Sequence, residues 1–119
     1  MRLINAVLCL LMILFIAVQY NDPDGPLWML IYAIPAIWTG IAVFWRHTLL
    51  VKTTQIFLLL CTAGAVAGIV HYWPSTPGWW RQEVWWDVET AREGMGMMVV
   101  AVVLCVVWFS KPAASPPQT

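Results

Sequence analysis

The sequence predicts an all-α integral membrane protein, a four-helix bundle whose two termini both lie in the cytoplasm. Composition is the first observation behind this prediction: of 119 residues, 61% are hydrophobic and 10% are charged, and the mean hydropathy is +0.76. A soluble domain carries roughly 25% charged residues, because water must wet its surface. The second observation is four apolar segments of nearly membrane-spanning length, since a helix crosses the hydrocarbon core in about 20 residues. The third is the placement of the basic residues between these segments.

The four expected spans form a single domain over residues 1–110. They lie at about residues 3–20, 26–45, 53–72 and 89–109. The first apolar run follows Arg2 and so resembles a signal peptide, but it is longer than a typical signal core and lacks an A-x-A exit, so we expect a retained helix. The tryptophan-rich stretch 79–88 is a candidate for a short helix lying flat in the membrane interface. The tail 111–119, rich in Pro, Ala and Ser, is expected to be disordered.

The charged residues predict the orientation of the spans. One side carries four bases and no acid: Arg2, Arg46, Lys52 and Lys111. The other side carries Arg81 and Arg92 together with all six acids: Asp22, Asp24, Glu83, Asp87, Glu89 and Glu93. Because Lys and Arg favour the cytoplasmic side, both termini should lie inside, and the first and third connections outside. The expected location is the inner membrane of a bacterium.

Charge, cysteine and histidine content exclude several classes of protein. The formal net charge of zero leaves no basic surface for nucleic acid, so no nucleic-acid partner is expected. The three cysteines form no C-x-x-C pair, which counts against a thiol oxidoreductase or a structural zinc site. The two histidines, His47 and His71, lie at opposite ends of the spans. They cannot share a haem, so no haem is expected.

The side expected to face outward also gathers most of the tryptophans. Six of nine lie there: Trp28, Trp73, Trp79, Trp80, Trp85 and Trp86. Acids count little in setting topology, so the positive-inside rule does not explain why they cluster on the same side. Tryptophan prefers the headgroup layer, however, and an anchor in membrane lipid explains several of these residues without a binding site. A binding site and an interfacial anchor therefore both stay open.

The last span predicts a polar site at its outer end. Its uninterrupted apolar part, Gly94 to Phe109, has only 16 residues, so the span must draw Arg92 and Glu93 toward the hydrocarbon edge. Ionisable groups at that depth are costly unless they are paired, which makes them functional candidates. Glu89 and Glu93 share a helical face, with Arg92 three residues from Glu89. An interfacial ion-pair cluster, with acids at the positive end of the helix dipole, is the alternative.

A metal site is the sharpest form of this prediction. His71 ends the third span at the same side of the membrane, where a polar helix cap is its plainer interpretation. With Glu89 and Glu93 it forms a set of one imidazole and two carboxylates, which transition metals accept. The predicted metal ligands are therefore His71, Glu89 and Glu93, and a divalent metal is the cofactor that would suit them.

The first connection adds further polar candidates. Asp22 and Asp24 each precede a proline-led helix start and can act as the N-cap, so capping accounts for only one of them. Along the second span, Trp28, Tyr32 and Pro35 share one face, and the proline kink predicts that this face looks into the bundle. The predicted ligand-binding residues at this side are Asn21, Asp22, Asp24, Trp28, Tyr32 and Arg92.

Two motifs in these segments resemble a known family. The first joins Q-Y-N-D-P-D at residues 19–24 to Trp28 and to Y-A-I-P-A at residues 32–36, and the second is E-x-x-R-E-x-x-G at residues 89–96. Together they resemble the signature of the transmembrane protein 220 family, and the chain is similar to a small bacterial member. The likeness extends from the first span through the last. It implies a multi-span membrane protein and no particular reaction.

Three functions follow from these patterns. The first is a membrane protein whose outward-facing, acidic and Trp-rich site binds a metal ion, a lipid headgroup or another small polar ligand. The second is an accessory or assembly subunit with a membrane-protein partner or a second copy of itself, since Gly64 and Gly68 permit close helix contacts. The third, a small proton-coupled transporter, is disfavoured because no span has an ionisable residue at its centre. An enzyme stays open, although no nucleophile can be identified and the catalytic residues are unknown.

Overall fold

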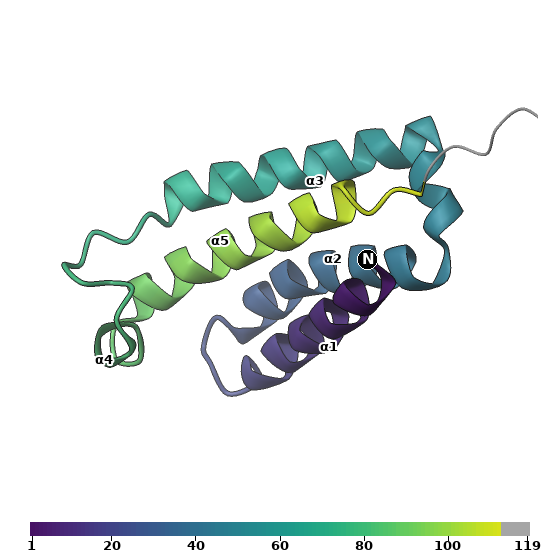
Figure 1. The fold of residues 1–119 in the computed structure, drawn as a ribbon. Coiled ribbons are helices and arrows are strands. Elements are labelled where there is room, and N and C mark those ends of the chain that lie inside the picture. Colours follow the sequence, from purple (N-terminus) through teal and green to yellow (C-terminus); the bar gives the residue numbers. More distant parts are fainter. Residues whose placement is uncertain (113–119) are drawn as a thin grey trace, which may run out of the picture.

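The computed structural model describes residues 1–112, and within that range the fold contains helices and no strand. Four long helices are present (Figure 1): α1 (Arg2–Val18), α2 (Gly25–Phe44), α3 (Lys52–His71) and α5 (Glu89–Trp108). Two short elements join them, the 3-10 helix η1 (Arg46–Leu50) and the single turn α4 (Gln82–Trp85). The all-helical prediction is confirmed, and each long helix begins and ends within two residues of its expected segment. The expectation for the tail falls largely on residues 113–119, outside the described range.

Three of the long helices meet the length of a membrane span. Helices α2, α3 and α5 have 20 residues each and are apolar enough to cross a membrane by length and composition. Helix α1 is also apolar but has 17 residues, about 25 Å at the usual rise. It ends at Val18, two residues earlier than expected, because Gln19 and Tyr20 turn away with hydrogen bonds to the carbonyls of Ile16 and Ala17.

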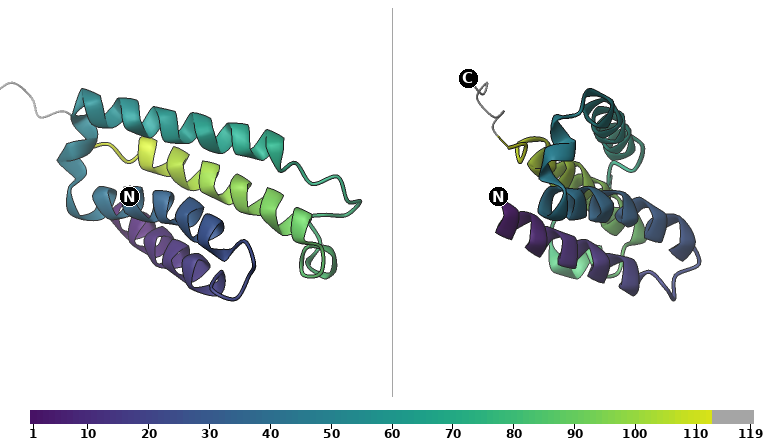
Figure 2. Two further views of the ribbon diagram at one scale, coloured as in Figure 1. Left: turned by 180° about the vertical axis from the view of Figure 1, so that it is seen from behind. Right: turned by 90° about the vertical axis from the view of Figure 1, so that its right-hand side faces the viewer.

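The long helices form two antiparallel pairs that meet along α5. Helix α1 packs on α2, α3 packs on α5, and α2 packs on α5. The order across the molecule is therefore α1, α2, α5, α3, as Figures 1 and 2 show from different sides. Helix α5 lies between two neighbours and is buried along much of its length, whereas α3 buries only Leu58 and Ala65. Most of the large apolar side chains on α3 are exposed, which suits contact with lipid.

The two ends of the helix array differ in chemistry. The N-terminus, η1 and the end of α5 lie at one end, while the α1–α2 connection and α4 lie at the other (Figure 1). At the first end, Asn5 is fully buried and its Nδ2 donates to Ser110 Oγ at 2.8 Å. The four bases of the basic side lie at this end, where Arg2 Nε donates to Val43 O at 3.1 Å. The separation of bases from acids expected from the sequence is thus a property of the fold.

The predicted inward face of α2 is confirmed. Trp28, Tyr32 and Pro35 are all buried, as is Thr39 one turn further on. Helix α2 continues through the proline, and Thr39 Oγ1 donates to the carbonyls of Pro35 and Ala36 at 2.8 and 3.0 Å. The hydroxyl thereby finds acceptors inside its own helix, as threonine commonly does in an apolar environment.

The third connection differs from the expected interfacial helix over residues 79–88. Helical structure there is limited to the four residues of α4. Gly78 adopts φ +69°, a left-handed conformation, and begins a turn in which the Arg81 N–H donates to the Gly78 carbonyl at 2.9 Å. Val88 has an extended backbone conformation, so the chain changes direction again before α5 begins. The connection is therefore folded by turns at both ends of a single helical turn.

The segment after α3 approaches α5 closely at Gly94, and this contact generates a stability prediction. A Cβ at this position would lie 2.5 Å from the Tyr72 carbonyl oxygen and 2.6 Å from Pro74 Cδ, and neither atom can move without shifting the chain. Gly94→Ala should lower the free energy of unfolding by about 1–3 kcal/mol, the usual range for overpacking. Denaturant unfolding in detergent micelles measures this change.

The control for that measurement is Gly64→Ala on α3, where an added Cβ meets nothing within 4 Å. Alanine favours a helix over glycine by up to about 1 kcal/mol, so this variant should be unchanged or more stable. Equal stability of the two variants would contradict close packing at Gly94.

Candidate functional site

A pocket of about 340 Å³ lies between the α1–α2 hairpin and the first turns of α5. Five segments contribute to it: the end of α1, the α1–α2 connection, the first half of α2, the turn α4 and the first half of α5. Its lining residues are Phe15, Val18, Gln19, Asp22, Asp24, Trp28, Tyr32, Trp85, Glu89, Arg92, Glu93, Met95, Gly96 and Val99. The pocket is therefore polar where the connections meet and apolar along the helices.

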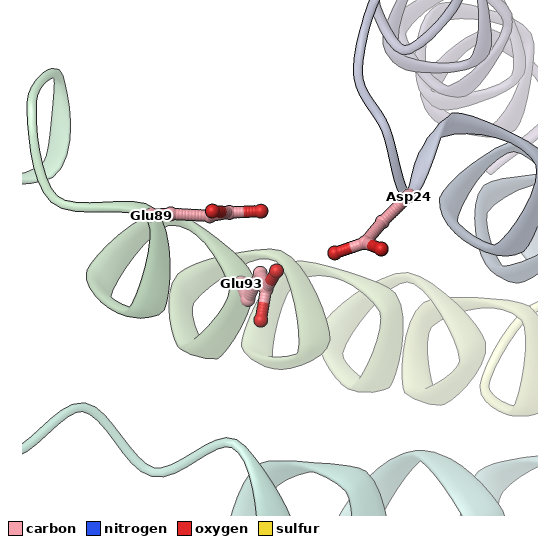
Figure 3. A group of neighbouring side chains, drawn as sticks. All are labelled: Asp24, Glu89 and Glu93. Atoms are coloured by element: carbon pink, nitrogen blue, oxygen red, sulfur yellow. The ribbon is translucent and has the colours of Figure 1, made fainter.

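Three carboxylates converge in this pocket. One oxygen from each of Asp24, Glu89 and Glu93 lies within 4.8 Å of the other two (Figure 3). Glu89 and Glu93 are one helical turn apart on α5, so their side chains share a face. Asp24 comes from the start of α2 and points across toward them. Oxygen ligands from two separate segments of the chain are thus brought together by packing.

Asp24 takes the N-cap position of α2 but makes no capping hydrogen bond with its side chain. The sequence predicts a cap at either Asp22 or Asp24, and the structure selects Asp24 because Gly25 and Pro26 begin the helix. Asp24 N-cap geometry fixes its backbone while its carboxylate turns to Glu89 and Glu93 (Figure 3). The capping hydrogen bond that Asp24 does not make usually stabilises a helix by about 1 kcal/mol. This orientation of the carboxylate is therefore costly unless the carboxylate interacts with another group.

Arg92 holds α4 against α5. Its guanidinium donates to the carbonyl of Trp85 at 3.4 Å and to the carbonyl of Trp86. These carbonyls belong to the last residue of α4 and the one after it, where backbone acceptors lack helical partners. Arg92 therefore places Trp85 beside the acids, and it is the one basic residue in a pocket lining that contains four acids.

Aromatic side chains form the wall of the pocket behind the acids. The Tyr32 ring lies edge-on to Phe15 at 5.3 Å and tilted against Trp28 at 5.8 Å between centroids. Trp28 also meets Tyr72 edge-on, so the wall is tied to the end of α3. Tyr32 reaches α5 at Gly96, where an added Cβ would collide with its hydroxyl oxygen. Within residues 1–112 that hydroxyl makes no hydrogen bond to another side chain or to the backbone.

The structure brings together seven of the residues singled out from the sequence. These line the pocket: Asp22, Asp24, Trp28, Tyr32, Glu89, Arg92 and Glu93. Asn21 is exposed in the connection and does not line it. His71 is exposed at the end of α3, edge-on to Tyr72 at 4.7 Å, and is likewise not part of the lining. Asp24, and not His71, is therefore the third side chain beside Glu89 and Glu93.

Sequence reasoning missed the apolar part of the lining. Phe15, Met95 and Val99 lie in apolar helices, where nothing in the sequence distinguishes a pocket residue from one that faces lipid. Gly96 is the last residue of the second family-like motif, and a glycine at this position was the one sequence feature that pointed to close packing there.

Fold and pocket together define a small helical membrane protein with an acidic pocket at one end of its helices. The family model described as Transmembrane family 220, helix, matches residues 6–109, and the chain belongs to this family. The match confirms the resemblance found in the two sequence motifs, both of which lie inside the matched range. No solved structure matches the chain.

The contact between Gly96 and Tyr32 generates a second prediction. Gly96→Ala should lower the free energy of unfolding by about 1–3 kcal/mol, because the new methyl group collides with the Tyr32 hydroxyl. Combining Gly96→Ala with Tyr32→Phe should restore most of that loss, since the nearest ring carbon would be 3.3 Å from the new Cβ. Tyr32→Phe alone is the control. Purely additive losses in the double variant would argue against this contact.

Proposed function

We propose that this protein spans the membrane four times, with both termini in the cytoplasm, and that its outward-facing pocket binds a cation. The observation that carries the proposal is the convergence of Asp24, Glu89 and Glu93, with oxygens within 4.8 Å of one another. The residues come from two segments that are far apart in the sequence, so their meeting is specified by the fold.

Electrostatics favours a cationic ligand. Like charges at such separations repel, and a cation placed among the three carboxylates converts the repulsion into attraction. Hard divalent cations accept carboxylate oxygens and complete their coordination with water, so three protein ligands are sufficient for a site. Arg92 is the basic neighbour, and its guanidinium is engaged with the carbonyls of Trp85 and Trp86. Negative charge therefore predominates where the oxygens meet.

Binding of Mn²⁺ to the purified protein tests the site directly. We expect saturable binding by isothermal titration calorimetry, and at least tenfold weaker binding in Glu93→Gln, which removes the half-buried charge of the three. A tenfold change corresponds to about 1.4 kcal/mol, a modest share of one charged ligand.

The matched control is Glu83→Gln. This residue lies on α4, is exposed and does not line the pocket, so the same change of charge should leave Mn²⁺ affinity unaltered. Equal affinities of the wild type and Glu93→Gln would remove Glu93 from the site, and no saturable Mn²⁺ binding would remove the metal ion as its ligand.

The proposed orientation rests on the two chemically distinct ends of the helix array. The end with η1 carries four bases, and cytoplasmic ends of membrane helices are enriched in Lys and Arg. For α1 to cross as well, its 17 residues must be extended by Gln19 and Tyr20, whose side chains are polar enough to reach the headgroups. The pocket then opens on the side away from the cytoplasm.

Cysteine labelling tests the orientation. With Cys9, Cys61 and Cys105 replaced by alanine, Ser75→Cys in the third connection should react with a membrane-impermeant maleimide in intact spheroplasts. His47→Cys in η1 should react only after lysis, because it lies at the basic end. Both positions are exposed, so access is decided by the membrane. The reverse pattern would place the pocket on the cytoplasmic side.

A further inference from the structure

We propose that the natural ligand of the pocket is an amphipathic amine, with its ammonium group at the three carboxylates and its apolar body against the aromatic wall. This inference rests on the proposed function, since it requires that Asp24, Glu89 and Glu93 attract a cation. It adds the chemical class of that cation: a protonated primary amine attached to a hydrophobic group about as large as one aromatic ring.

The size of the pocket exceeds what a metal ion needs. Its volume is about 340 Å³, whereas a water molecule takes roughly 30 Å³ in the liquid, so there is room for about ten waters. An ion among the carboxylates would fill only the end where Asp24, Glu89 and Glu93 meet. The volume also lies within the usual range of roughly 300–1,000 Å³ for small-molecule pockets. The remaining space can hold the apolar part of a larger ligand.

One face of α5 changes from acidic to apolar along the pocket. Glu89, Glu93, Gly96 and Val99 all line it. Their spacings of four, three and three residues place them on the same side of the helix. A ligand lying along this face therefore meets charge at one end and methyl groups at the other, which is the polarity of an amine with a hydrophobic substituent.

Aromatic rings complete the apolar end. Phe15, Trp28 and Tyr32 line the pocket, and the Tyr32 ring contacts both of the others, so the three present a continuous wall. Aromatic faces attract ammonium groups and also accept flat apolar bodies. An anionic ligand is disfavoured, since the lining carries four acids and one base.

Tyr32 supplies a neutral polar atom at the boundary. The residue is 6% exposed, yet its hydroxyl makes no hydrogen bond within residues 1–112 and lies beside Gly96 in the lining. Among the described residues, the one fully enclosed side-chain polar atom without a partner is Asn5 Oδ1, so the Tyr32 oxygen is accessible at the pocket wall and can pair with a ligand there. A primary ammonium has three N–H donors, enough to serve carboxylates and this oxygen together.

The probe for this inference is 2-phenylethylamine, titrated into the full-length protein in phosphatidylcholine vesicles. We expect saturable binding and displacement of Mn²⁺. Two matched compounds separate the parts of the ligand: propylbenzene has the same body without the charge, and methylamine has the charge without the body. Both should bind at least tenfold more weakly than 2-phenylethylamine.

Two matched variants test whether the apolar part of the ligand binds at the apolar end of the pocket. Val99→Phe fills the apolar end and should weaken binding of 2-phenylethylamine at least tenfold. Val102→Phe makes the same change three residues further along α5, at an exposed position outside the lining, and should have no effect. The unfolding temperature of each variant shows whether it is folded. Equal affinity in Val99→Phe and the wild type would overturn the inference.

The outcomes distinguish this inference from the proposed function. Binding of Mn²⁺ without binding of 2-phenylethylamine, or equal binding of propylbenzene, overturns the amine and leaves the cation site. Failure of both Mn²⁺ and 2-phenylethylamine to bind removes the cation site as well. Where the amine binds, vesicles containing phosphatidylethanolamine identify its source: competition by that lipid indicates a membrane amine, and no competition indicates a soluble one.

Discussion

Two segments, the end of α3 with its following connection and helix α2, approach helix α5 closely at two of its glycines. The rest of the structure depends on these two contacts. At Gly94 the Tyr72 carbonyl and the Pro74 ring occupy the space where a side chain would stand, and at Gly96 the Tyr32 hydroxyl does so. In lipid there is little hydrophobic force to hold helices together, and small residues that allow backbones to meet take its place. Both contacts fall within the first eight residues of α5, so Glu89 and Glu93 lie at the start of a helix that is packed on two sides.

The helices themselves could be predicted, because length and composition decide them. An uninterrupted apolar run has no other way to satisfy its backbone in lipid, and the breaks at Asp22 and Trp73 are rich in turn-forming residues. The inward face of α2 followed from the spacing of Trp28, Tyr32 and Pro35, since a lipid-facing kink is disfavoured. The third connection was harder, because the tryptophan-rich stretch 79–88 suggested a longer helix than the four residues of α4 that follow the turn at Gly78.

The sequence indicated at which end of the helices the candidate site lies, but not which side chains come together there. Clustering of acids identified the end of the helices where the pocket lies, yet the sequence predicted His71 as the third metal ligand, whereas Asp24 lies beside Glu89 and Glu93. Which of them faces these acids depends on which sides of α5 its neighbours take, and contacts at glycines decide that. The apolar lining could not be foreseen either, because Phe15 and Val99 resemble the lipid-facing residues around them.

The hydrogen bond between Asn5 and Ser110 links the first turn of the first helix to the residues just after the last. Asn5 is fully buried, and an amide group in an apolar environment is costly until it has a partner. During synthesis, Asn5 enters the membrane about a hundred residues before Ser110 is made. Before that, the Nδ2 of Asn5 can donate only to the Met1 carbonyl beside its own helix, at 2.9 Å, and the arrival of α5 adds Ser110 Oγ as an acceptor and closes the acidic pocket. Assembly of this protein is in that sense completed from its C-terminus.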